Sequence, residues 1–530
     1  MKTKITIKPL KLIFSILFAL TVVLSRHIVV KWNDYSSLES CYFSDVHFVD
    51  VIFWIPITIL VYLVVTNIPL LKEESLFEEK RDGRCLAQFV LSFLAIMILW
   101  LPYPFSYWPG GTYPDTMNSV AIATSMEPWN THEPIGYTIL WKIVATISPI
   151  AISEESHEST GIGVFTALQC IGMAAMLASF VWWNYRRGLK KAVTWILTLV
   201  FALFPLYPFY AVSLWKDSVF GIVIFLYTWY LYVIYEEIRI NGNLKTKNIV
   251  LYTILSVCCA FFRNNGIYVL IFSSIMILVI MRKNKEALKK LAITSLAVII
   301  ASLIIQHPVF DAAGLNTDTS VESLGVPLQQ TAYIVATDGT MSESDMDVIN
   351  NIMPYEFWRE TYCPVVSDNI KFSENFNRDY FNTHTGDFFK TYLSLCAKNP
   401  VKAVKGYLLA TIGFWDVFDE NGSSYIYPES VVWNGVFQGD WFGYYTKVSF
   451  RELVWPKDYI SSAVWAWLML LCLILVLDVK PNKAIVFMPG LGVWLTILVA
   501  APISFSFRYL FGLFLCLPIY LLCLVNKNND

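Results

Sequence analysis

The segment IGYTILWKIVATISPIAI (135–152) decides which loops of the chain lie on which side of a membrane. It is apolar enough to form a membrane-spanning helix, but its charged flanks argue against this. A span here would put the acidic run 153–160 on the inner side and the basic run 186–191 on the outer side, against the Lys/Arg excess of cytoplasmic loops. We therefore expect 135–152 to lie along the outer membrane surface as an amphipathic helix, with Trp141 and Lys142 toward the lipid headgroups.

The composition of the whole chain excludes an ordinary soluble domain. Of its 530 residues, 56% are hydrophobic and only 15% are charged, and the mean hydropathy is +0.53. The ten cysteines contain no CxxC pair, so neither a zinc site nor a disulfide framework is indicated. Long apolar runs predict an all-α polytopic membrane protein with about 12 transmembrane helices. The expected spans are 11–30, 49–71, 85–103, 160–183, 191–212, 218–236, 249–262, 266–281, 289–306, 460–478, 484–501 and 507–525.

Basic residues orient these spans, because they gather in alternate connections. This places the N- and C-termini in the cytoplasm. The residues that mark the cytoplasmic side are Lys2, Lys4, Lys8, Lys11, Lys72, Lys80, Arg81, Arg84, Arg186, Arg187, Lys190, Lys191, Arg239, Lys245, Lys247, Arg282, Lys283, Lys285, Lys289, Lys290, Lys480 and Lys483.

The same alternation divides the chain into three parts. We expect an N-terminal transmembrane module at 1–306, whose long outer loop covers about 104–159, and C-terminal transmembrane helices at 460–530. The polar segment 307–459 falls outside the membrane. It is too long and too rich in Asp, Asn, Trp and Tyr for a connector, which predicts a small external subdomain, with a second candidate interfacial helix at 403–415.

Three ionisable residues lie in the outer loop. Asp115, in YPDTMNS (113–119), is the candidate catalytic base, because a carboxylate can take the proton of an attacking hydroxyl; the structural alternative is a helix N-cap. His132 and Glu133, in THEPIGYT (131–138), could orient an acceptor, bind a divalent cation with Asp115, or simply form a polar rim.

Three cations fall at the outer ends of helices. Lys216, Arg263 and Arg508 have the charge to bind a phosphate, whereas snorkelling is the common alternative for any single one of them. Asp217 is a supporting residue that could pair with its neighbour Lys216. The break RNNG (263–266) fits either a tight hairpin or unwound backbone lining a cavity. Their gathering at one edge of the membrane indicates an amphiphilic site.

These motifs and their order resemble the first-loop pattern of GT-C membrane glycosyltransferases. They are more similar still to a bacterial polytopic family known as a domain of unknown function and thought to be GT-C-like. The similarity extends over roughly 100–520. The motifs that carry it are YPDTMNS (113–119), THEPIGYT (131–138), LWKDS (214–218), FRNNG (262–266), VPLQQTA (326–332), YLLATIGFW (407–415) and FRYLFGLFLCLP (507–518).

The resemblance implies a sugar linked to a polyprenyl phosphate as donor and a glycan or lipid hydroxyl as acceptor. Asp115 would deprotonate the acceptor, and Arg263, Arg508 and Lys216 would stabilise the leaving phosphate in a single inverting displacement. Glu133 stands where the family pattern has a proline after the histidine, so the need for a divalent cation stays open.

Two other functions compete with this one. A polymerase or ligase of surface glycans would handle the same donors, and a flippase or transporter of lipid-linked saccharides would instead need charges along a path through the bilayer. The lipid bilayer is a partner in every case, and nucleic acid in none. Composition favours a bacterial plasma membrane. The resemblance implies a role in modifying cell-envelope glycans such as polysaccharide.

Overall fold

The computed structural model describes residues 8–31, 34–79, 86–148, 150, 160–315, 320–418, 439–448, 450, 461–500 and 503–526. Within these ranges the regular elements are helices and two short strand pairs, joined by turns and loops. Strands β1 (Ile28–Val30) and β2 (Cys41–Phe43) pair antiparallel, and β3 (Leu71–Lys72) pairs in parallel with β4 (Val525–Asn526). The described residues do not include Lys2, Lys4, Lys80, Arg81, Arg84 or most of the acidic run 153–160. They also leave out residues 316–319, 419–438, 449 and 451–459 of the expected external subdomain.

Apolar helices make up most of the described chain. Such runs form helices because a helix satisfies its backbone groups internally, which lipid cannot do. The main ones are α1 (Pro9–Ser25), α2 (Phe48–Asn67), α4 (Leu86–Trp100), α5 (Pro102–Ser106), α8 (Thr160–Arg186), α9 (Lys191–Leu203), α10 (Leu206–Val212), α11 (Lys216–Asn241), α12 (Thr246–Phe261), α13 (Gly266–Ile280), α14 (Lys285–Ile304), α26 (Ala463–Leu477), α27 (Met488–Ala500) and α28 (Phe511–Cys523). Short helical segments extend three of them: η1 (Ile305–Val309) and α15 (Phe310–Ala312) follow α14, η4 (Pro481–Phe487) precedes α27, and η5 (Phe507–Leu510) precedes α28.

Fewer of these helices are full spans than the sequence predicts. Six are long and apolar enough to cross a membrane, or seven if α9 and α10, bent by 49° at Pro205, form one span, rather than twelve. The others are short: α13 has 15 residues and α12 has 16. A helix of this length reaches only about 22–24 Å, less than the roughly 30 Å of a typical hydrocarbon core. The chain is nevertheless an all-α membrane protein.

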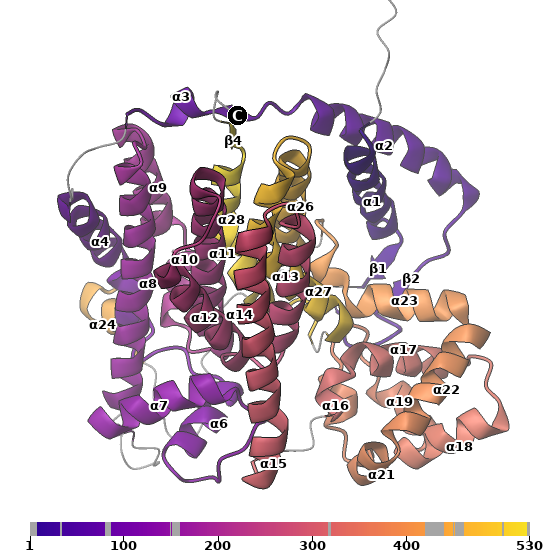
Figure 1. The fold of residues 1–530 in the computed structure, drawn as a ribbon. Coiled ribbons are helices and arrows are strands. Elements are labelled where there is room, and N and C mark those ends of the chain that lie inside the picture. The colour runs from indigo at the N-terminus through magenta and orange to yellow at the C-terminus, as the bar shows by residue number, and fades with distance from the viewer. Residues whose placement is uncertain are drawn as a thin grey trace, which may run out of the picture.

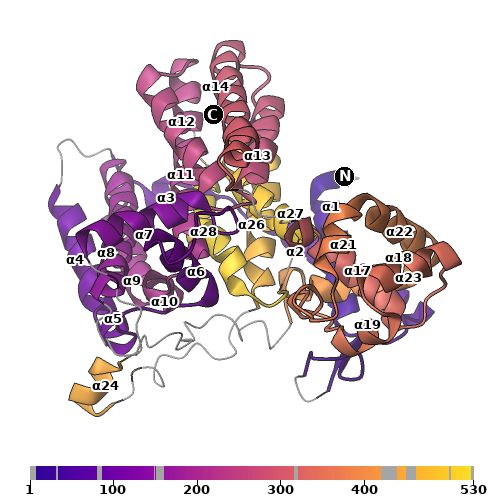
Figure 2. The ribbon, with the colours of Figure 1, turned by 90° about the horizontal axis from the view of Figure 1, so that it is seen from below.

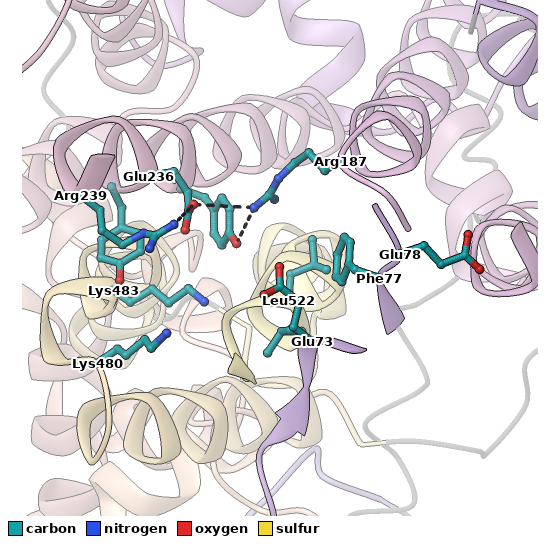
Figure 3. Close-up of a pocket in the computed structure, with 12 residues that line it drawn as sticks. Glu73, Phe77, Glu78, Arg187, Glu236, Arg239, Lys480, Lys483 and Leu522 are labelled. Atoms are coloured by element: carbon teal, nitrogen blue, oxygen red, sulfur yellow. Dashed lines mark hydrogen bonds and ion pairs between the residues drawn. The ribbon is translucent and has the colours of Figure 1, made fainter. Parts of the chain in front are cut away.

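The two described chain ends lie at the same end of the helix bundle. Lys8 and Lys11, at the start of α1, pair with Asp478 after α26, with Nζ–Oδ2 distances of 3.2 and 3.3 Å. Strand β4 meets β3, next to α3 (Glu73–Leu76). Figure 1 shows this end at the top, and a small cavity lined by Arg187 and Lys483 opens there (Figure 3). Helices α6 (Pro114–Ala123), α7 (Ile135–Ile147) and α15 lie at the opposite end (Figure 1).

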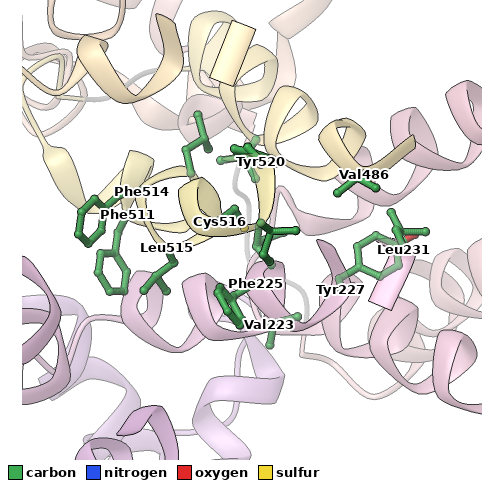
Figure 4. Packing of buried hydrophobic residues seen from close by; sticks show 14 of the residues in the cluster. Val223, Phe225, Tyr227, Leu231, Val486, Phe511, Phe514, Leu515, Cys516 and Tyr520 are labelled. Carbon is green, nitrogen blue, oxygen red and sulfur yellow. The ribbon is translucent and has the colours of Figure 1, made fainter. Parts of the chain in front are cut away.

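Helices α11 and α28 form the centre of the bundle (Figure 4). They approach closely because small residues face each other: a Cβ on Gly221 would lie 2.7 Å from Cδ1 of Phe511, and a Cβ on Gly512 would lie 3.6 Å from Cα of Gly221. Buried side chains such as Phe225 and Leu515 fill the rest of the contact. This packing fixes η5, at the start of α28, beside the first turn of α11.

A helical subdomain lies beside the bundle, at the lower right of Figure 1. Its buried core includes Trp358, Phe381 and Leu409 and also takes in Phe43 of β2. Short helix α24 (Trp441–Thr446) packs instead on α5, and Figure 2 shows it away from the subdomain. The subdomain helices are α16 (Ser320–Ser323), α17 (Gly325–Ala336), α18 (Glu343–Ile352), α19 (Tyr355–Thr361), α20 (Asp368–Lys371), α21 (Arg378–Thr383), α22 (Thr385–Lys398) and α23 (Pro400–Ala410), followed by η2 (Ile412–Phe414).

Helix α7 occupies the segment that the sequence predicts to be interfacial. The expectation that Trp141 faces the headgroups is wrong, because Trp141 is fully buried and stacks on Phe165 of α8 with 4.0 Å between ring centroids. Lys142 is part-buried and donates to the carbonyl of Ala123 at 2.9 Å. The outward face of α7 is an apolar stripe with a four-residue repeat, formed by Ile139, Ile143 and Ile147.

Candidate functional site

The segment that precedes α6 is hydrogen-bonded to the segment that precedes α11. The Gly111 amide donates to the Val212 carbonyl at 2.8 Å, and the Leu214 amide donates to the Gly111 carbonyl at 2.9 Å. Thr116 Oγ1 donates to the Leu214 carbonyl at 2.6 Å. The buried side-chain amide of Gln169, on α8, donates to three backbone carbonyls of the segment before α11, those of residues 210, 211 and 213. The first turns of α6 and α11 are therefore held side by side.

Asp115 and Glu133 share one ammonium group. Nζ of Lys216, the first residue of α11, lies 3.2 Å from Oδ2 of Asp115 and 2.9 Å from Oε2 of Glu133. Tyr113 is the N-cap of α6, which leaves Asp115 in the first turn with its carboxylate turned to this contact. Glu133 is completely buried in the turn before α7, and its Oε1 has no hydrogen-bond partner among the described residues.

Arg508 extends the cluster from the other side. Its Nη1 donates to Oδ2 of Asp115 at 3.1 Å, and its Nη2 donates to the hydroxyl of Tyr509 at 2.9 Å. The guanidinium also stacks on the ring of Trp215 at 3.8 Å, and Trp215 stacks in turn on Tyr113 with 3.8 Å between centroids. A flat cation on an aromatic face is held in one orientation, so Arg508 is fixed before any ligand arrives.

Asp217 and Arg263 complete the cluster. Nη1 of Arg263 lies 3.0 Å from Oδ1 of Asp217, and Nε of Arg508 lies 3.8 Å from Oδ2 of Asp217. The expected pair between Asp217 and Lys216 is not among the ion pairs of the described residues, because adjacent residues on a helix point in different directions. We call the connected set Glu133, Lys216, Asp115, Arg508, Asp217 and Arg263 the ionic network.

The RNNG segment (263–266) forms a tight turn between α12 and α13 and also holds the loop that carries His132. The Gly266 amide donates to the Arg263 carbonyl at 2.8 Å. The side-chain amide of Asn264 donates to the carbonyls of Thr131 and His132 at 3.3 and 3.0 Å. Of the two alternatives for this segment, the hairpin is confirmed. The turn connects Arg263, which lies in the ionic network, to the loop before Glu133.

Gly266 is required by this turn, which gives a stability prediction. A Cβ at Gly266 would lie 1.8 Å from the carbonyl oxygen of Cys259, so Gly266→Ala must displace backbone. We expect the free energy of unfolding to fall by roughly 1–3 kcal/mol, measured as a lower midpoint of thermal unfolding in nanodiscs. Gly172→Ala on α8 is the control, because no atom lies within 4 Å of its added Cβ, and it should not lower the midpoint. Equal midpoints for the two variants would contradict the prediction.

A cavity of about 310 Å³ opens directly beside the ionic network. Its wall includes Glu133, Asn118 one helical turn after Asp115 on α6, and Arg378 from α21 of the helical subdomain. Six of its seven lining residues have polar or charged side chains. Its remaining lining residues are Ile122, Glu127, Asn130 and His132. A polar hollow of this size suits a hydrated, hydroxyl-rich group rather than a lipid tail.

The two carboxylates of the ionic network differ in acidity. Burial alone would raise the pKa of Asp115, but the charges of Lys216 and Arg508 outweigh it and hold that pKa at about 2. For Glu133, burial dominates and raises the pKa above its ordinary value, although Lys216 pulls it down. Opposed shifts on neighbouring carboxyl groups are typical of sites that assign them different proton-transfer roles.

The residues do not form a typical site for a divalent cation. No group of three or more His, Cys, Asp or Glu side chains in the described ranges is arranged to hold a metal ion. The ammonium of Lys216 stands between Asp115 and Glu133, where a bridging cation would have to sit.

The structure brings together most of the residues that the sequence singles out. Asp115, Glu133, Lys216, Asp217, Arg263 and Arg508 are all members of the ionic network. His132 is exposed and lines the adjacent cavity. Sequence reasoning missed Trp215, Tyr113, Asn264 and Arg378. The first three lie within two residues of predicted ones, whereas nothing in the sequence near Arg378 connects it to this site.

Comparison with known proteins gives one match. A family of unknown function (DUF6020) matches residues 129–530. No curated protein and no solved structure matches the chain. The matched range contains the whole ionic network except Asp115. Because the match covers more than half of the sequence, the chain belongs to this family of unknown function, DUF6020.

Proposed function

We propose that the chain is a GT-C-like membrane glycosyltransferase, which moves a sugar from a polyprenyl-phosphate donor to an acceptor hydroxyl. One observation carries this proposal: three cations and three carboxylates form a single network that shares Glu133 with an open polar cavity. Cations that suit a phosphate thus lie next to a cavity that suits a sugar. Carboxylates that can accept a proton contact these cations, and one of them, Glu133, also lines the cavity.

The donor phosphate would be bound by Arg508, Lys216 and Arg263. Arginine offers a planar fork that matches phosphate oxygens, and Arg508 is already fixed on Trp215. Arg263 is supported in the same way, since it lies over the ring of Tyr509 at 5.0 Å. Carboxylates of the ionic network pair with these cations in the structure. A bound phosphate would take over part of their hydrogen bonding.

That exchange would prepare Asp115 as the base. Lys216 and Arg508 hold its pKa at about 2, which makes it a weak proton acceptor while both contacts persist. When the donor phosphate draws the two cations away, the pKa of Asp115 rises toward its ordinary value. Binding of the donor would therefore make Asp115 a stronger base at the time when the leaving phosphate is in place.

The chemical step would be a single displacement. The acceptor oxygen forms a bond to the anomeric carbon as its proton passes to Asp115. The bond between the anomeric carbon and the phosphate oxygen breaks, and its electron pair stays on the polyprenyl phosphate, where Arg508, Lys216 and Arg263 stabilise the charge. His132 and Glu133 would orient the acceptor from the cavity wall. The expected product has the inverted anomeric configuration.

The membrane arrangement that fits this role has the ionic network on the outer side of a bacterial plasma membrane. Both described chain ends would then be cytoplasmic, because they lie among lysines and cytoplasmic segments are enriched in Lys and Arg. The shorter apolar helices, such as α12 and α13, would complete up to twelve crossings where the bilayer thins locally. An outward site matches a polyprenyl-linked donor, because nucleotide sugars are cytosolic.

Transfer can be measured with the purified chain in nanodiscs, a set of radiolabelled polyprenyl-phosphate sugars, and membrane extract as acceptor. We expect release of polyprenyl phosphate together with label in a single-sugar product. Products of increasing length would indicate the alternative of a surface-glycan polymerase or ligase. Movement of intact donor across liposomes, without cleavage, would contradict the proposal and support a flippase.

A further inference from the structure

A second charged cavity lies at the end of the bundle opposite the ionic network (Figure 3). Helix α11 connects the two: its first turn carries Lys216, and its last turns carry Glu236 and Arg239 at the cavity. Twenty residues of helix separate these positions by about 30 Å. The cavity measures about 90 Å³ and lies between α3, the end of α8, η4 and the end of α28. None of its lining residues takes part in the proposed transfer.

Four cations converge on this cavity: Arg187, Arg239, Lys480 and Lys483. Glu236 is engaged by two of them, with its Oε2 at 3.1 Å from Nη2 of Arg239 and 3.8 Å from Nη2 of Arg187. Figure 3 shows the carboxylate of Glu78 pointing away from the cations. This leaves Glu73 and Glu236 facing four positive charges, so the cavity carries an excess of positive charge.

Arg187 is held ready for an acceptor that the described residues do not supply. Its guanidinium lies over the rings of Trp183 and Tyr232, at 4.4 and 5.1 Å from their centroids. Nη2 donates to the Tyr232 hydroxyl at 3.3 Å, while Nη1 is buried without a hydrogen-bond partner. A ligand oxygen would supply the acceptor that this buried donor lacks.

Lys483 adds a buried ammonium to the same wall. Its side chain is almost completely buried, and its Nζ donates to the Cys523 carbonyl at 3.0 Å. The ammonium also lies 5.3 Å from the centroid of Tyr232, the same ring that stacks against Arg187. An ammonium has three N–H donors, and the Cys523 carbonyl takes one of them. Tyr232 thus positions both an arginine fork and a lysine ammonium toward one small space.

We propose that this cavity binds a phosphate group, either free phosphate or the headgroup of an anionic lipid. A planar guanidinium with an adjacent ammonium is the pairing that recognises phosphate oxygens in proteins. The volume of about 90 Å³ holds a few water molecules or one phosphate, and excludes a nucleotide. The site does not depend on the proposed transfer, since it shares no residue with the ionic network.

Binding can be measured by native mass spectrometry and by the thermal unfolding midpoint of the full chain, with inorganic phosphate and dihexanoyl phosphatidic acid as separate probes. We expect saturable binding that Arg187→Gln and Lys480→Gln each weaken at least tenfold. Arg186→Gln is the matched control, because Arg186 is an exposed cation of the same helix end that stacks on Trp182 outside the cavity. Lys480→Gln changes a less buried residue than Lys483, so this variant is expected to fold.

The outcomes separate the two sources of phosphate. Tighter binding of phosphatidic acid than of inorganic phosphate supports a lipid headgroup, and equal binding supports free phosphate. Binding that is unchanged in Arg187→Gln and Lys480→Gln, or no binding of either probe, overturns the proposal. Binding that disappears in Arg508→Lys instead would assign the phosphate to the ionic network, and would also overturn it.

Discussion

Asp115→Asn is expected to lower the rate of sugar transfer by about 10²- to 10⁴-fold, the usual contribution of a general base. The amide fills the same space and can still accept hydrogen bonds from Lys216 and Arg508, so the fold should survive. It cannot take a proton from the acceptor. Initial rates with saturating donor and acceptor, in nanodiscs with equal amounts of folded chain, measure the effect.

Asp387→Asn is the matched control for this change. Asp387 is an exposed carboxylate of α22 that pairs with Lys390 at 3.0 Å, so the same substitution removes a surface ion pair far from the proposed chemistry. The control should transfer at the wild-type rate. If Asp115→Asn also transfers at that rate, Asp115 is not the base, and its place in the ionic network is structural.

The pH profile separates Asp115 from Glu133. The pKa of Asp115 is about 2, so Asp115 gains a proton only at a pH below the range in which kcat/KM can be measured. Burial raises the pKa of Glu133, so this carboxylate gains a proton before Asp115 does as the pH falls. A fall of kcat/KM on acidification that occurs above pH 4.5 should therefore be absent in Glu133→Gln. This variant should keep most of its rate of sugar transfer at neutral pH. A rate loss as large as that of Asp115→Asn would make Glu133 the base.

Hydropathy predicted where helices form but not which of them span. Apolar runs identify α12 and α13 correctly, yet hydropathy alone cannot decide whether the break between them at 263–266 is a tight turn or unwound backbone. The segment 135–152 shows the same limit. Its apolar character predicts a helix, but only the approach of Phe165 from α8 decides that Trp141 is buried and that isoleucines face outward. Such contacts come from tertiary packing, which no local pattern contains.

The site was more predictable than the fold, for a physical reason. Ionisable side chains at helix ends near a membrane are costly unless they find partners, so their positions alone indicated convergence on one side. The pairing was not predictable. Asp217 sits next to Lys216 in sequence but pairs with Arg263, because the helix turns adjacent side chains apart. Arg378 reaches the cavity from a distant subdomain, which sequence spacing cannot indicate.

Arg508→Lys is expected to lower kcat by about 10²- to 10³-fold, the usual effect of removing one preorganised donor from a site of developing charge. Lysine keeps the positive charge but loses the fork that reaches both Asp115 and Tyr509. It also loses the flat stack on Trp215 at 3.8 Å, so its position is no longer fixed. Arg359→Lys is the control, since Arg359 is 67% exposed and its nearest carboxylate, on Asp338, lies 3.8 Å away.

The size of this loss should depend on the leaving group, which distinguishes a catalytic cation from a structural one. A polyprenyl diphosphate leaves with its charge spread over more oxygens than a monophosphate, so it needs less stabilisation from the protein. If Arg508 stabilises the leaving phosphate, Arg508→Lys should slow the diphosphate donor less than the monophosphate donor, while Asp115→Asn slows both to a similar degree. Equal losses for the two donors in Arg508→Lys would mean that Arg508 acts by holding Asp115 and Trp215 in place, and that the leaving group is stabilised elsewhere.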